Sequence, residues 1–126
     1  MKTIYVAHSM TNGQNDTQDI DALLQWLHKN GHSIVFPNYA LFHDMLASQA
    51  LESIKNANIV IADVSNYSHG VGFEIGFAYS LKKDVIIIAN NSVKDKISKF
   101  ILGLFPDIIF YKSKEDLIIE IHKKIA

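Results

Sequence analysis

A glutamate that follows a pair of glycines is the residue of this chain most suited to chemistry. Glu74 stands in the stretch DVSNYSHGVGFEIGFA, shortly after Gly70 and Gly72. Glycine permits tight turns and lets backbone N–H groups approach a ligand. A helix is predicted over residues 70–82, and Glu74 lies near its first turn, where the helix dipole favours the ionised carboxylate. Such a carboxylate is a candidate nucleophile or an anchor for hydroxyl groups, although it can also serve only to complement the dipole.

Other kinds of site are poorly matched by the sequence. The glycines are spaced GxGxxxG, which differs from the dinucleotide fingerprint. No cysteine is present and the histidines are scattered, so we expect no metal site and no cofactor. Asp63 stands where a phosphoreceiver domain carries its aspartate, but the loop HSMTNG lacks the acidic residues that hold Mg²⁺. Hydroxyls and glycine in that loop could cradle an FMN phosphate, yet no aromatic flavin-binding loop is evident.

The elements that must position Glu74 alternate between strands and helices. Short β-rich runs predict strands at 3–7, 33–36, 58–62, 84–89 and 107–110. Helices are expected between and after them, at 16–30, 44–56, 70–82, 93–104 and 114–125. This alternation implies a parallel sheet with right-handed crossovers. We therefore expect one α/β domain over residues 1–126, a flavodoxin-like (Rossmann-like) three-layer sandwich with strand order 2-1-3-4-5.

The strand order determines where a ligand should bind. The switch point of such a sheet lies between strands 1 and 3, and ligands bind at the carboxyl ends of the strands there. The loops at 8–15 and 63–72 reach that edge, so they are the segments expected to form the site. His8 and His69 lie in these loops and could contact a ligand or only face solvent.

Composition limits the partners of the chain. The net charge of −1 gives no field that would recruit a nucleic-acid polymer or an anionic membrane. No apolar run approaches the roughly 20 residues of a membrane span, and no secretory signal opens the chain, so a cytoplasmic location is expected. All 12 basic residues are lysines. Any phosphate must therefore be held by lysines, hydroxyls or backbone N–H groups rather than by arginine.

The stretch SHGVGFEIGFA resembles the signature of the nucleoside 2-deoxyribosyltransferase superfamily, most closely its 2'-deoxynucleoside 5'-phosphate N-hydrolase branch. The opening IYVAHSM is similar to the first strand and loop of that family. The resemblance implies cleavage of an N-glycosidic bond in a nucleoside or nucleoside 5'-monophosphate. In that chemistry a glutamate attacks the anomeric carbon, and water or a second base then takes the sugar.

The resemblance also assigns roles to individual residues. Glu74 matches the nucleophile, and Gly70 and Gly72 match the loop glycines. The remaining matches are hydroxyl-bearing residues of the substrate pocket, which could equally pack or cap turns and helices: Tyr5, Ser9, Ser68 and Ser98. Ser68 favours the hydrolase branch over the transferases, which tend to have Asp there. Ser98 resembles a serine that reaches the 5'-phosphate of a neighbouring subunit, so a homodimer or larger homo-oligomer is expected.

Three departures from the family pattern concern the residue that protonates the leaving base and the residues that bind the phosphate. Ala50 occupies the position of an aspartate that helps to protonate the leaving base. Thr11 and Gln14 stand where the hydrolases carry basic side chains, and Asn38 replaces a histidine. The acid could instead come from His43 or Asp44, which could equally be a helix cap and its neighbour. Asp63 could also reach the pocket, although an aspartate there is expected mainly to cap the turn.

Two functions remain open from the sequence. The intact signature favours an enzyme that cleaves or transfers at the N-glycosidic bond. Ala50 and the lack of arginine favour a nucleoside- or nucleotide-binding or sensor module that kept the pocket and lost efficient catalysis.

Overall fold

A parallel sheet of five strands in the order β2-β1-β3-β4-β5 forms the centre of the computed structural model, which describes residues 1–9 and 18–126. This confirms the predicted fold class and strand order. The strands are β1 (Thr3–Ala7), β2 (Ser33–Val35), β3 (Ile59–Asp63), β4 (Asp84–Asn90) and β5 (Ile109–Tyr111). Thr11 and Gln14, the loop residues of interest, lie outside the described part of the chain.

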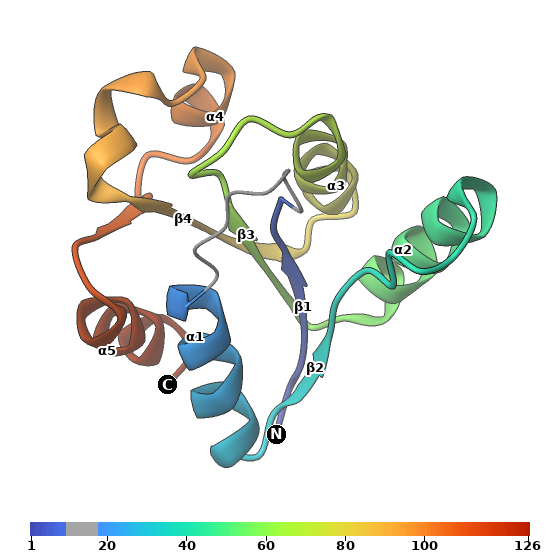
Figure 1. The fold of residues 1–126 in the computed structure, drawn as a ribbon, viewed down its shortest axis with the longest axis horizontal. Helices are drawn as coiled ribbons and strands as arrows, with labels where there is room; N and C mark the ends of the chain where they lie inside the picture. The colour runs from blue at the N-terminus through green and yellow to red at the C-terminus, as the bar shows by residue number, and fades with distance from the viewer. Residues whose placement is uncertain (10–17) are drawn as a thin grey trace.

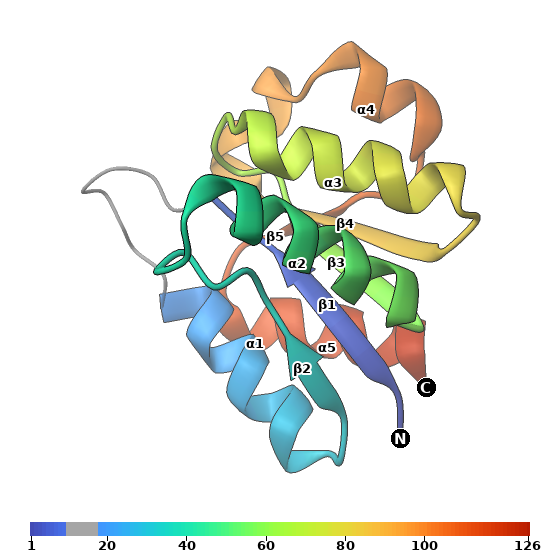
Figure 2. The ribbon, with the colours of Figure 1, turned by 90° about the vertical axis from the view of Figure 1, so that its right-hand side faces the viewer.

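Helices cover both faces of the sheet (Figures 1 and 2). One layer contains α1 (Gln18–Lys29) and α5 (Lys114–Ile125). The other contains α2 (His43–Asn56), α3 (His69–Ser80) and the short α4 (Lys99–Leu104). Among the described helices, none has the length and apolarity needed to cross a membrane.

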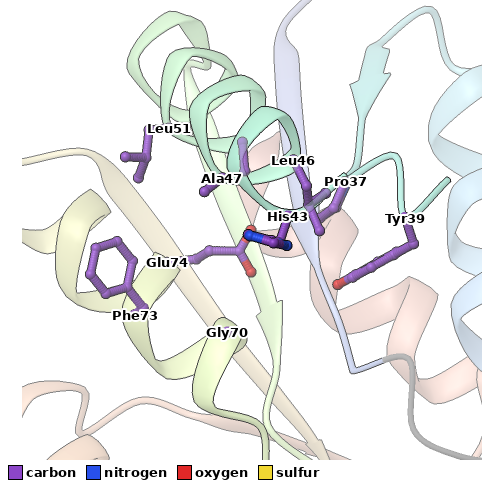
Figure 3. Close-up of a pocket in the computed structure, with 10 residues that line it drawn as sticks. Pro37, Tyr39, His43, Leu46, Ala47, Leu51, Gly70, Phe73 and Glu74 are labelled. Atoms are coloured by element: carbon purple, nitrogen blue, oxygen red, sulfur yellow. The ribbon is translucent and has the colours of Figure 1, made fainter. Parts of the chain in front are cut away.

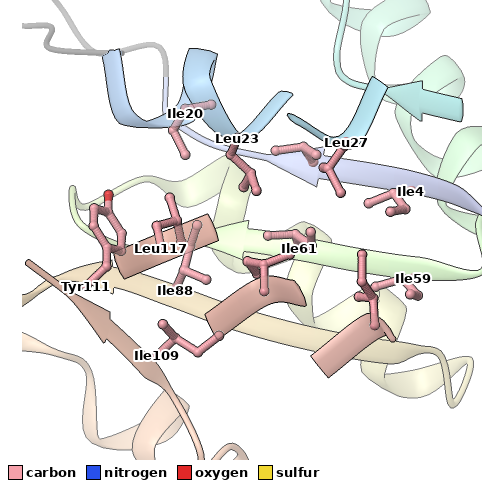
Figure 4. Close-up of a cluster of buried hydrophobic side chains, with 13 residues drawn as sticks. Ile4, Ile20, Leu23, Leu27, Ile59, Ile61, Ile88, Ile109, Tyr111 and Leu117 are labelled. Carbon is pink, nitrogen blue, oxygen red and sulfur yellow. The ribbon is translucent and has the colours of Figure 1, made fainter. Parts of the chain in front are cut away.

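Alternation along the strands sends neighbouring residues into two separate cores. Every residue of β3 is buried, as expected for a strand covered on both faces. Ile4 and Ile61 point into the core under α1 and α5, which is filled by large branched side chains (Figure 4). Tyr5 and Ala62 point toward α2 and α3, where many buried residues are alanines. The second core therefore has smaller side chains between the sheet and the helices α2 and α3.

The predicted helix over 93–104 is wrong as a single element. The structure has a 3₁₀ helix, η1 (Asn91–Lys96), followed by α4, with Ile97 in an extended conformation between them. Asn90 and Ser98 each cap one of these pieces, because their side chains accept backbone N–H groups of Ser92 and Phe100. Asn90 and Ser98 are therefore N-cap residues that mark two separate helix starts, one before η1 and one before α4.

The other boundaries shift by one or two residues. Gly31 ends α1 with φ of +85°, as its position predicted. The helix expected over 70–82 stops at Ser80, because Lys82 takes the left-handed conformation with φ of 60°. The expected helix start at 16 lies outside the described residues, and α1 is described from Gln18 onward.

Candidate functional site

A cavity of about 210 Å³ opens between α2 and α3, beside the loop that follows β2 (Figure 3). Its walls are almost entirely apolar, and the polar side-chain atoms drawn in Figure 3 belong to Glu74, His43 and Tyr39. The cavity is lined by Pro37, Tyr39, His43, Leu46, Ala47, Ala50, Leu51, Gly70, Phe73 and Glu74. An apolar slot of this kind suits a flat, weakly polar group such as an aromatic ring.

Helical spacing explains why these residues share the cavity. On α2, Ala50 follows Ala47 by three residues and Leu46 by four, which places all three on one face of the helix. On α3, Gly70 and Glu74 are four residues apart and point the same way. The alanines leave space between the helices that larger side chains would fill.

Glu74 is held inside this cavity by a residue of the first strand. The hydroxyl of Tyr5, which is fully buried, donates a hydrogen bond to Oε2 of Glu74. Glu74 itself is 7% exposed. Its burial raises the pKa of the carboxyl above the ordinary value, and the Tyr5 hydrogen bond opposes that rise by stabilising the ionised form. The arrangement orients a carboxylate oxygen without neutralising it by a cation.

Burial, rather than the helix dipole, determines the direction of the Glu74 pKa shift. The helix dipole was expected to favour ionised Glu74, but burial raises its pKa instead. Gly70 and Gly72 lie in the first turns of α3 without a positive φ, within the helix expected over 70–82. A Cβ at Gly72 would meet open space and one at Gly70 would only touch Ser68, so these glycines keep the start of α3 uncovered.

Ser68 and Ser98 lie on the other side of α3 from the main cavity. They line a second cavity of about 270 Å³, together with Gly72 and Lys96. Each serine caps a helix, and its hydroxyl oxygen accepts a backbone N–H. Each hydroxyl hydrogen can still be donated to a ligand. Ser9 is half-buried beyond the end of β1 and is not among the residues that line either cavity.

The structure separates the three candidate acids. Asp44 accepts the N–H of Met45 and lines a groove on a different side of α2. Asp63 is buried and caps the turn after β3, where it accepts hydrogen bonds from Ser65 and Tyr111. Only His43 of the three lines the cavity that contains Glu74.

Other loop residues of interest lie around the mouth. His8 lines a hollow next to Tyr39, whose hydroxyl donates to the His8 backbone carbonyl at 3.3 Å. His69 is the exposed first residue of α3. Asn38 is exposed, and its side chain accepts the N–H of Ala40.

Several lining residues were not identified from the sequence. Tyr39 and Pro37 follow β2, which pairs with β1 next to the switch point, and that position was the signal available for them. The apolar face of α2 gave a helix signal but none for a cavity, because core and cavity faces share the same spacing. In the described residues, no cluster of His, Asp and Glu is arranged to hold a metal ion.

The Tyr5–Glu74 hydrogen bond predicts a pH effect. Tyr5→Phe removes the donor that stabilises ionised Glu74, so the pKa of this carboxyl should rise further. A reaction that needs the carboxylate is lost as pH falls through that pKa, and the variant should lose it at a higher pH. The acid limb of a kcat/KM profile measures the change. Tyr79→Phe, a change on the exposed side of α3, is the control, and identical acid limbs for Tyr5→Phe and wild type would contradict the prediction.

Comparisons with known proteins identify the family and support the fold. The family model described as nucleoside 2-deoxyribosyltransferase matches residues 4–104. A CMP N-glycosidase from Clostridium botulinum has a similar fold, with a TM-score of 0.78 and 20% identity over 97% of this chain and 99% of that chain. A 2-deoxyribosyltransferase from Bacillus psychrosaccharolyticus superposes with a TM-score of 0.69 and 22% identity over 92% of this chain and 90% of that one.

A third structure, of a conserved protein from Enterococcus faecalis, has a TM-score of 0.74 and 18% identity over 99% of both chains. At these identities the structures support the fold. No curated protein matches the sequence.

Proposed function

Because the chain belongs to the nucleoside 2-deoxyribosyltransferase family, we propose that it breaks the N-glycosidic bond of a nucleoside or nucleoside 5'-monophosphate, with Glu74 as nucleophile. The observation that carries the proposal is a buried carboxylate, hydrogen-bonded by Tyr5, at the wall of an apolar cavity. A similar fold in a CMP N-glycosidase and in a 2-deoxyribosyltransferase supports both the bond and the substrate class.

The cavity provides the parts this reaction needs. The base packs against the apolar face of α2 and Phe73, while the sugar presents its anomeric carbon to the Glu74 carboxylate. Glu74 forms a bond to that carbon as the bond to the base nitrogen breaks, and the base takes the bonding electrons. Water, or a second base, then displaces Glu74. Exclusion of solvent from the apolar walls protects the glycosyl–enzyme ester from early hydrolysis.

A 5'-phosphate has a candidate position in the second cavity. Ser68 offers a hydroxyl donor there and Lys96 offers a positive charge, while Ser98 serves the phosphate of the neighbouring subunit in a homodimer. Without arginine, the phosphate receives no bidentate contacts. The affinity for a monophosphate should therefore only modestly exceed the affinity for the corresponding nucleoside. Gly70 and Gly72 leave the first turn of α3 open toward the ligand, and Ser9 stands at the edge of the loop after β1.

A panel of nucleosides and nucleoside 5'-monophosphates tests the function. The purified protein is incubated with each compound, and free base is measured by chromatography, with and without a second base as acceptor. We expect base release from some members of the panel. Release only when an acceptor base is present would identify a transferase, and release in water alone a hydrolase. Absence of base release from all members would contradict the proposal.

Assembly into a homodimer is proposed from exposed apolar residues around both cavities. Tyr67, Phe73 and Phe100 are 82%, 64% and 79% exposed, although they line the two cavities on either side of α3. A symmetric pairing would cover them and bring Ser98 toward the site of the neighbour.

Light scattering should therefore give twice the 14.2 kDa chain mass, and Phe100→Ser should shift the protein toward monomer. Ile119→Ser, on the opposite layer, should leave the mass unchanged. A wild-type protein that remains monomeric at high micromolar concentration would remove Ser98 from a shared site.

A further inference from the structure

We propose that His43 is the acid that protonates the departing base, an inference that rests on the proposed function. Its position carries the argument: His43 begins α2 and lines the same cavity as Glu74, seven residues before Ala50 on the same face of the helix. Figure 3 shows its imidazole and the Glu74 carboxylate both projecting into the cavity, one from α2 and one from α3.

Other proton donors of the cavity are less suited to this task. Tyr39 lines it and Tyr5 reaches Glu74, but burial raises the pKa of both phenols, so they hold their protons more tightly. The remaining lining residues of α2 are Leu46, Ala47, Ala50 and Leu51, which cannot donate a proton. Histidine is the side-chain type whose charge changes between pH 5 and 8, which suits general acid catalysis near neutral pH.

The environment of His43 fits a repeating proton transfer. Its side chain is exposed at the mouth of the cavity, where the water that attacks the anomeric carbon can reach it and return its proton. Phe42 packs against it with ring centroids 5.6 Å apart and planes inclined by 52°. This contact restricts the imidazole without supplying a hydrogen-bond acceptor that would compete for its proton.

The proton balance of the reaction is complete with these two residues. As Glu74 attacks the anomeric carbon, the glycosidic bond breaks and its electron pair moves onto the base, which takes the proton of His43. Neutral His43 then accepts a proton from the water that attacks the anomeric carbon. The ester bond to Glu74 breaks, the sugar leaves with a hydroxyl group, and both side chains return to their starting states.

A matched pair of substrates separates protonation from other roles. The base of 2'-deoxyguanosine needs a proton to leave, whereas 7-methyl-2'-deoxyguanosine already carries the positive charge on its base. His43→Gln should lower base release from the first by roughly 10²–10⁴-fold, the usual value of a positioned acid. Release from the second should change by less than about tenfold. For an enzyme that prefers pyrimidines, 2'-deoxyuridine and the more acidic 5-fluoro-2'-deoxyuridine form the equivalent pair.

His28→Gln, at an exposed position near the end of α1, is the control and should behave as wild type on both substrates. Equal losses on both members of the pair would overturn the role of His43 as acid, because they would indicate a positioning or structural effect. Unchanged release by His43→Gln from both would overturn it as well. Failure of the proposed function is distinct: the wild type itself would then release no base from any of these nucleosides or from their 5'-monophosphates, and both proposals would fall.

Discussion

Glu74→Gln is expected to lower base release by on the order of 10⁴-fold or more, as removal of a nucleophile does in other covalent enzymes. The amide has nearly the same shape, and its carbonyl can still accept the Tyr5 hydrogen bond, but it cannot attack the anomeric carbon. Single-turnover measurement of released base, with calorimetry for nucleoside binding, separates the chemical step from affinity. Binding should persist in the variant.

Stability provides an independent check of the same variant. Burial raises the pKa of Glu74 above its unfolded value, so its contribution to stability is present at acid pH and is lost as pH rises through the folded pKa. Glutamine has no ionisable group, so the variant does not lose this stability as pH rises. Thermal unfolding should show Glu74→Gln above wild type at pH 8, with the difference shrinking toward pH 4. A variant that releases base at the wild-type rate, or is less stable at pH 8, would contradict the assignment.

Ala50→Asp is expected to restore an acid to the cavity when His43 is missing. Ala50 lies in the cavity wall with Glu74 and is 9% exposed. Two carboxyl groups in one poorly solvated site retain a proton between them, which leaves one as acid and the other as nucleophile. In the His43→Gln background, base release should rise by about tenfold or more, a fraction of what a well-placed acid provides. With His43 present, the gain should be smaller.

The matched control is Ala50→Asn, which has the same size and no acidic proton. Addition of Glu74→Gln should abolish the gain, since the new acid needs the nucleophile. An equal effect of Asp and Asn, or no gain in the His43→Gln background, would contradict the prediction. A wild type that binds nucleosides without turnover, but gains turnover with Ala50→Asp, would identify the second function class, a binding module descended from an enzyme.

The sequence by itself determined the order of strands and helices and the placement of Glu74. Apolar runs such as residues 58–62 mark buried strands, because a strand covered on both faces has no polar side. Right-handed crossovers then limit the order of five such strands to few choices, and the observed order is the expected one. The stretch around Glu74 was sufficient to indicate the family to which the model over residues 4–104 assigns the chain.

Only the tertiary structure decided the environment of that glutamate. Tyr5 and Glu74 are 69 residues apart and meet because β1 lies beside β3, on the face that α3 covers. Local reasoning used the helix dipole, a weak and screened effect, and so expected an easily ionised carboxyl. Burial depends on every element around the group and outweighs the dipole, so the pKa rises instead. The sequence likewise left the acid open among His43, Asp44 and Asp63, and the packing of α2 against α3 brings only His43 of the three into the cavity with Glu74.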